Sequence, residues 1–229
     1  SSGTQTLNSG GSSFYNLTHS RARTLQRITN NLAVTGAFTN SAGTFDANGL
    51  TNTVTGLATV SKGVYQAKTA TQTFNGGLTV SASTFGNPST FTCSTGTVNI
   101  NGNLALTSTG FFNLSTFTGS TGAVNINGNL TLSGYSCTFT APTGTFTLNG
   151  GLTISGSGVI YGRFIGSTGA VDINGNLTVS ALAAFTAPTG TFTLSGNLAI
   201  SSGGTFTKGG TLTLDGTTQN VSDANATTQ

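Results

Sequence analysis

Hydrophobic and polar residues alternate with a period of two along most of the chain. In residues 98–106, 124–132 and 146–154, valine, isoleucine, leucine and phenylalanine occupy one parity, and asparagine, threonine and alanine occupy much of the other. A period of two predicts β-strands with one face buried and one face solvated, and it excludes the 3.6-residue period of an amphipathic helix. Each such segment is interrupted by a glycine, which predicts two short strands joined at a corner.

These segments belong to a repeat that runs through the chain. Residues 120–133 recur at 167–180 with 12 of 14 positions identical, and residues 139–155 recur at 185–201 with 14 of 17 identical. Weaker copies lie upstream, near Asn30 and Gly56. The pattern predicts about ten copies of one unit and a single domain over residues 1–229.

One glycine marks the corner of each clear unit, and successive corners are 26, 26, 22, 25, 21 and 20 residues apart. We expect glycine there because it tolerates the φ and ψ values that a sharp bend requires. The corner glycines are Gly76, Gly102, Gly128, Gly150, Gly175, Gly196 and Gly216.

A third short strand follows in each unit and carries a phenylalanine. Three strands and three turns in 20–26 residues predict an all-β fold, a right-handed parallel β-solenoid (β-helix) of about ten coils. At about 4.8 Å per coil the rod is about 48 Å long. Equivalent residues stack in such a rod, so we expect an internal ladder of Phe117, Phe139, Phe164, Phe185 and Phe206.

Composition then limits the chemistry. Asp, Glu, Lys and Arg make up 5% of the chain, with four acidic residues and one histidine, so we expect no enzyme activity, no cofactor and no metal site. No stripe of basic residues with interleaved aromatics is present, and no hydrophobic run approaches the length of a membrane helix. We therefore expect neither a nucleic-acid partner nor membrane insertion.

Two sets of residues are candidates for binding or for covalent chemistry. His19, Arg21, Arg23 and Arg27 concentrate positive charge in nine residues. The three arginines are a candidate anion contact, and the alternative is a solvated edge strand whose charge deters pairing. Cys93 and Cys137 share the inward parity but lie at opposite ends of the third strand, two coils apart, which favours two buried free thiols over a disulfide.

Two further surfaces suggest alternative functions. The unit length varies mainly between the second and third strands, so one edge of the rod carries irregular loops, and a glycan binder would need exposed aromatic residues there. Tyr135 and Tyr161 are the candidates. Outward threonine pairs at residues 145/147, 191/193 and 211/213 resemble the ice-binding face of certain antifreeze proteins, but residues 97/99, 123/125 and 170/172 interrupt the column.

The segments G-x-V-x-I-N-G-N-L-T-L-S and S-S-F-Y-N-L-T (12–18) resemble the repetitive stalk regions of large prokaryotic cell-surface proteins, similar to filamentous-haemagglutinin and autotransporter passenger solenoids. The resemblance implies an extracellular, cell-surface protein with a structural or adhesive role. We predict a rigid spacer or a filament subunit that associates head to tail, with an adhesin for surface glycans and an ice-binding solenoid as alternatives.

Overall fold

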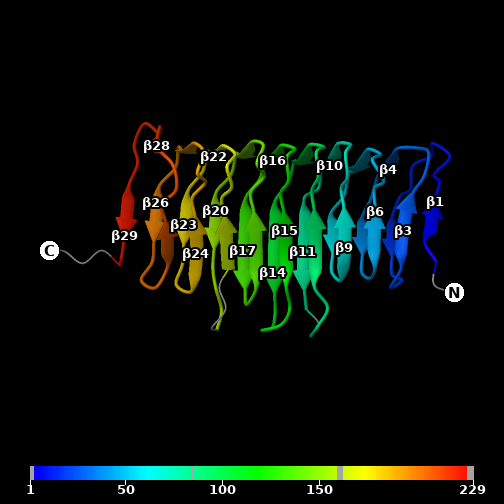
Figure 1. The fold of residues 1–229 in the computed structure, drawn as a ribbon, viewed down its shortest axis with the longest axis horizontal. Helices are drawn as coiled ribbons and strands as arrows, with labels where there is room; N and C mark the ends of the chain where they lie inside the picture. The colour runs from blue at the N-terminus through cyan, green and yellow to red at the C-terminus, as the bar shows by residue number, and fades with distance from the viewer. Residues whose placement is uncertain (1–2, 84, 159–161, 226–229) are drawn as a thin grey trace.

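A computed structural model describes residues 3–83, 85–158 and 162–225. Over these residues the chain forms 29 short strands and no helix, which confirms the predicted all-β parallel solenoid of about ten coils. The strands form three parallel sheets that run along the rod, and the two ends of the chain lie at opposite ends of it (Figure 1).

Each coil from the second to the tenth contributes one strand to each sheet, in the order sheet A, sheet B, sheet C, and the first coil contributes strands to sheets A and C alone among the described residues. Sheet A contains β1 (Gln5–Leu7), β3 (Thr24–Arg27), β6 (Thr44–Asp46), β9 (Gly63–Gln66), β12 (Ser89–Thr92), β15 (Ser115–Thr118), β18 (Cys137–Thr140), β21 (Gly162–Ile165), β24 (Ala183–Thr186) and β27 (Thr205–Thr207). Sheet B contains β4 (Leu32–Val34), β7 (Asn52–Val54), β10 (Gln72–Phe74), β13 (Val98–Ile100), β16 (Val124–Ile126), β19 (Phe146–Leu148), β22 (Val171–Ile173), β25 (Phe192–Leu194) and β28 (Leu212–Leu214). Sheet C contains β2 (Leu17–His19), β5 (Phe38–Asn40), β8 (Ala58–Val60), β11 (Leu78–Ala82), β14 (Leu104–Ser108), β17 (Leu130–Gly134), β20 (Leu152–Ile154), β23 (Leu177–Val179), β26 (Leu198–Ile200) and β29 (Val221–Asp223).

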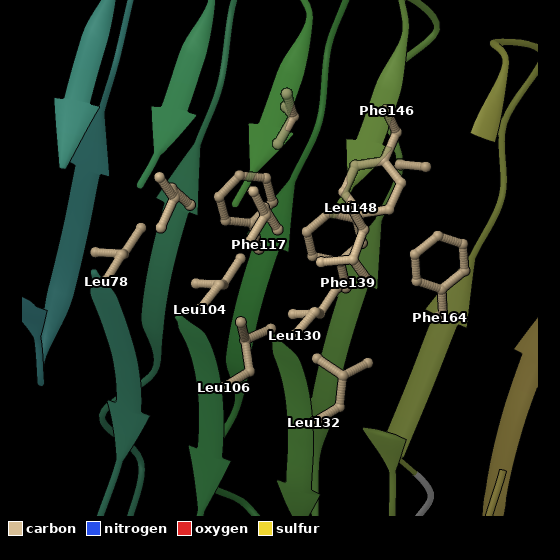
Figure 2. Close-up of a cluster of buried hydrophobic side chains, with 14 of the residues drawn as sticks. Leu78, Leu104, Leu106, Phe117, Leu130, Leu132, Phe139, Phe146, Leu148 and Phe164 are labelled. Atoms are coloured by element: carbon tan, nitrogen blue, oxygen red, sulfur yellow. The ribbon is translucent and has the colours of Figure 1, made fainter. Parts of the chain in front are cut away.

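Equivalent residues of successive coils pair in register, so each inner position forms a column along the rod. In sheet A, Phe117 pairs with Phe91 on one side and with Phe139 on the other. Figure 2 shows Phe117, Phe139 and Phe164 as rings in one row and Leu78, Leu104 and Leu130 in a parallel row. This in-register burial supplies the core that the short strands cannot form singly.

The phenylalanine column is longer than the five residues named from the sequence. It contains eight rings, with neighbouring ring centroids 4.7–5.3 Å apart and ring planes within 27° of each other. Its members are Phe45, Tyr65, Phe91, Phe117, Phe139, Phe164, Phe185 and Phe206. All are buried except Phe206 in the last coil, which is partly buried.

The corner glycines lie between sheets B and C, but the reason predicted for them is wrong. None of the seven has a positive φ. Instead the corners stack closely: a Cβ on Gly102 would lie 2.8 Å from the backbone nitrogen of Gly77, and one on Gly128 would lie 2.7 Å from the carbonyl carbon of Gly102. The same holds at Gly76, Gly150, Gly175, Gly196 and Gly216, where a Cβ would meet an atom at 2.6 Å or less. A side chain is therefore excluded by the neighbouring coil and not by the bend.

Candidate functional site: the loop edge and the N-terminal interior

The connections from sheet C to sheet A form an irregular edge of the rod. Six residues separate β11 from β12, six separate β14 from β15 and seven separate β20 from β21, whereas only residues 61–62 join β8 to β9. Residues 85–88 and 109–114 reach farther than the connections near the ends (Figure 1, lower side). The connections from sheet B to sheet C keep three residues from β4 to β26, so the length variation lies where the sequence placed it.

Exposed aromatic rings gather on this edge in the middle of the rod. Phe85 is 74% exposed and Phe112 is 66% exposed, and their ring centroids lie 5.3 Å apart in an edge-to-face arrangement. The ring of Phe111 lies 4.9 Å from that of Tyr135, which is half-buried. We call these four residues the aromatic strip. It adds three phenylalanines to Tyr135, the edge residue predicted from the sequence, and Tyr161 lies outside the described residues.

Two polar side chains beside the aromatic strip donate within their own loops, whereas Oδ1 of Asn113 has no hydrogen-bond partner among the described residues. Asn87 donates its amide to the carbonyl of Phe85, and Ser108 donates its hydroxyl to the carbonyl of Asn113. Asn113 itself is buried. The strip therefore presents mainly ring carbons to solvent, together with the half-exposed Leu114.

The predicted anion contact is corrected at one of its three residues. Arg21 and Arg23 are exposed, between β2 and β3, on the same edge as the aromatic strip. Arg27 is fully buried at the end of β3, because it shares the inward parity of Leu25. It therefore cannot contact an anion at the surface, and His19, at the end of β2, is buried as well.

Arg27 belongs to a polar network inside the N-terminal coils. Its Nη1 donates to Oδ1 of Asn52, whose amide donates to the Tyr65 hydroxyl and to Gln72, and the same hydroxyl donates to Gln72 Oε1. Burial lowers the pKa of Arg27, and Tyr65 partly opposes this shift. Burial raises the pKa of Tyr65, against the hydrogen bond from Asn52 and the charge of Arg27.

Part of this interior remains unsatisfied. Nε and Nη2 of Arg27 have no hydrogen-bond partner among the described residues, and neither does Nε2 of His19, although His19 Nδ1 lies 2.8 Å from Oδ1 of Asn40. A buried donor without a partner costs about 1–3 kcal/mol. The network therefore places a local destabilising contribution in the N-terminal coils.

Asparagine ladders explain the I-N-G-N-L motif, whose polar residues sequence reasoning left without a role. Before the corner glycine, each amide donates to the asparagine of the preceding coil, at 2.7–2.9 Å. This ladder contains Asn75, Asn101, Asn127, Asn149 and Asn174. After the glycine, Oδ1 of Asn103 and of Asn129 each accepts from a backbone amide of the next coil.

The cysteines and the acidic residues do not form a reactive cluster in the part of the chain that the structure covers. Cys93 and Cys137 are free and buried, and burial raises the pKa of the Cys137 thiol to about 12. The pKa of Asp172 is raised by partial burial and then by the charge of Asp215. No group of three or more His, Cys, Asp or Glu residues that could hold a metal ion occurs in residues 3–83, 85–158 and 162–225. Over the same ranges no helix is long and apolar enough to cross a membrane.

Threonines form columns on more than one sheet. On sheet B, Asn99, Asn125 and Asp172 interrupt the outward column, at positions the sequence identified. A longer column, which the sequence analysis did not single out, runs along sheet C. It contains Thr18, Thr39, Thr59, Thr79, Thr131, Thr153 and Thr178, with Ala105 between the fourth and fifth.

Comparison with known proteins gives no relative: no family model, no curated protein and no solved structure matches the chain. The resemblance to stalk and passenger solenoids therefore holds at the level of architecture, a parallel β-solenoid of about ten turns. The fold places the chain in the class of repetitive β-solenoids. The surfaces and the ends of the rod are the features that bear on its function.

Proposed function

We propose that the chain is an extracellular structural module, a rigid rod that serves on a cell surface as a spacer or as the subunit of a head-to-tail filament. The observation that supports this best is the continuous stacking of three sheets of ten, nine and ten strands, with eight rings in one inner column. Each coil packs only on its two neighbours, so the number of coils determines the length of the rod.

The C-terminal end of the described rod is suited to receive another coil. Leu212 and Leu214 of β28 are 36% and 43% exposed, and Val221 of β29 is 58% exposed. The residues paired with them one coil earlier, Phe192 and Leu194, are buried. A further coil would cover these side chains and pair with the free edges of β27, β28 and β29. That coil belongs to the same chain if the rod is a spacer and to a second copy if it is a filament subunit.

Concentration-dependent assembly tests the filament form. We expect wild-type protein to form end-to-end fibres in negative-stain microscopy as its concentration rises, and the double variant Leu214→Lys/Val221→Lys to remain as single rods. Such a contact between unlike ends does not close, so growth continues without a fixed size. Leu57→Lys is the control, because Leu57 is 47% exposed at the corner between sheets B and C and far from the end coil. Rods that keep the same length at every concentration would contradict the filament form, and the spacer form would then remain as the proposed function.

The spacer form is tested by changing the number of coils. A second copy of residues 120–166, inserted after Gly166, adds one two-coil super-repeat. We expect a rod longer by about 10 Å in small-angle scattering, with an unchanged cross-section. A chain that unfolds or becomes wider instead would contradict a module whose length is set by stacking. Surface labelling of intact source cells tests the location, since labelling only after permeabilisation would contradict an extracellular rod.

A further inference from the structure

The aromatic strip is an exposed apolar surface that the rod itself does not use. Phe85 and Phe112 are among the most exposed large hydrophobic residues of the described chain, and they come from successive connections of the same edge. Exposed apolar patches on soluble proteins commonly mark interaction sites, and phenylalanine and tyrosine are enriched in the cores of protein interfaces. The strip is therefore a candidate interaction surface.

The surroundings of the strip argue for a neutral, apolar partner. No Asp, Glu, Lys or Arg occurs from Thr69 to Gly162, so the coils that carry the strip are uncharged, and Lys62 lies on the neighbouring connection of the same edge. Two donors beside the strip, the amide of Asn87 and the hydroxyl of Ser108, are bonded to backbone carbonyls of their own loops and are not available to sugar hydroxyls. This chemistry favours another aromatic surface over a saccharide.

We propose that the strip is the contact between two copies of this chain, which lie side by side and antiparallel about a two-fold axis near Phe112. The strip is complementary to itself, because a two-fold axis places the ring pair of Phe85 and Phe112 against the ring pair of Phe111 and Tyr135 of the other copy. Twofold pairing of identical surfaces is also the commonest symmetry among soluble oligomers.

The charges on the loop edge select the antiparallel orientation. Arg21 lies near the N-terminal end of this edge, and Asp223 is exposed at the end of β29, in the last coil. A parallel pair in register would place Arg21 of one copy opposite Arg21 of the other. The antiparallel pair brings the arginine end of one rod toward the aspartate end of the other, which removes that repulsion.

Gly158 supports one half of the strip from below. A Cβ on Gly158 would lie 2.7 Å from Cε1 of Tyr135 and 3.3 Å from Cζ of Phe111. Any side chain at this position would displace the two rings. The absence of a side chain lets Gly158 lie against this pair of rings while Phe85 and Phe112 stay open to solvent.

Sedimentation equilibrium over a concentration series tests the pairing. We expect wild-type mass to level off at twice that of the chain, and Phe112→Ser and Phe85→Ser to raise the dissociation constant tenfold or more. Tyr15→Ser is the matched control, because Tyr15 is 77% exposed at the opposite corner, between sheets B and C. The experiment uses the Leu214→Lys/Val221→Lys background, so that end-to-end growth does not mask a closed dimer.

Spin labels test the orientation. Ser20 and Ser202 lie on the loop edge in the first and last connections, and Ser20→Cys and Ser202→Cys provide attachment sites while the native thiols stay buried. Antiparallel pairing predicts a shorter distance between a Ser20 label and a Ser202 label on different copies than between two Ser20 labels. The reverse order would overturn the orientation. A monomer at all concentrations, or a monomer that binds neutral oligosaccharides through Phe112, would overturn the pairing itself.

Discussion

The N-terminal and middle coils use the same inner positions for opposite chemistry. In the first column of sheet B, Asn52 and Gln72 pair with each other, and from Val98 onward the column is apolar. In sheet C, His19 pairs with Asn40, and the column then continues with Val60. The backbone register is continuous through both changes, so the fold does not depend on an apolar residue at every inner position.

We expect the two regions to differ in stability. In the middle coils, buried hydroxyls such as those of Ser89 and Ser115 bond to backbone carbonyls, and one buried oxygen, Oδ1 of Asn113, lacks a partner among the described residues. In the N-terminal coils, two guanidinium nitrogens of Arg27 and Nε2 of His19 lack partners within the described chain. A solenoid can open from one end because each coil depends only on its neighbours. We therefore expect the N-terminal coils to open at a lower free energy than the middle coils.

The largest effect is expected in the apolar region. Phe185→Ala should lower the free energy of unfolding by about 3–5 kcal/mol, because the rings of Phe164 and Phe206 on either side cannot close the cavity. Urea denaturation measures the change. Phe206→Ala is the control and should cost clearly less, since Phe206 is covered from one side only. Equal losses at the two positions would contradict the column as the source of stability.

The polar region should respond in the opposite direction. Arg27→Met should leave stability unchanged or raise it by up to about 4 kcal/mol, because it replaces a buried guanidinium, two of whose nitrogens have no partner among the described residues, with an apolar side chain of similar length. The readout is again the free energy of unfolding. Arg21→Met changes an exposed residue and should stay within about 0.5 kcal/mol of wild type. A large loss of stability in Arg27→Met would show that the polar network stabilises these coils.

Alkaline pH should distinguish the two regions, because burial raises the pKa of Tyr65 in the N-terminal coils and of the two thiols in the middle coils. The folded chain keeps protons on Tyr65 and on both thiols while the unfolded chain loses them, so stability falls as pH rises through 9 for the cysteines and through 10 for the tyrosine. Each group contributes at most about 1.4 kcal/mol per pH unit. The free energy of unfolding, measured by urea denaturation, should fall less steeply above pH 9 in Cys93→Ala/Cys137→Ala than in wild type. In Tyr65→Phe it should fall less steeply above pH 10. An unchanged slope in these variants would contradict the assignment.

The smallest effect concerns the surface. Asn127→Ala removes hydrogen bonds to Asn101 and Asn149 on the exposed corner and should cost about 0.5–1.5 kcal/mol. Thermal unfolding measures it, and Thr131→Ala, on the outward face of the next strand, is the comparison. A loss as large as that of Phe185→Ala would mean that the outer ladders, and not the core, hold the coils together.

The solenoid and most of its core could be predicted because the repeat makes them recognisable in the sequence. A period of two fixes which side chains point inward, and identical units 46 or 47 residues apart imply stacked coils. Phe45 and Tyr65 were missed because the N-terminal copies diverge too far from the later ones for alignment. The corner glycines were placed at the right positions, but their close approach to the next coil depends on stacking distances that a sequence does not contain.

The candidate sites were harder to predict, for two separate reasons. Arg27 and His19 carry the inward parity of Leu25 and Leu17, a signal that was present, but their charge suggested a solvated edge. Phe85, Phe111 and Phe112 lie in connections without any period, so only the structure shows that successive loops bring them together.

Native-state hydrogen exchange tests the central comparison most directly, because it measures the opening free energy of each segment. We predict that amides in residues 24–46, which span β3 to β6, exchange at a lower free energy than amides in residues 115–148, which span β15 to β19. In Arg27→Met the opening free energies of the two segments should become more similar. Equal protection throughout the wild-type rod, or greater protection at residues 24–46, would contradict the account.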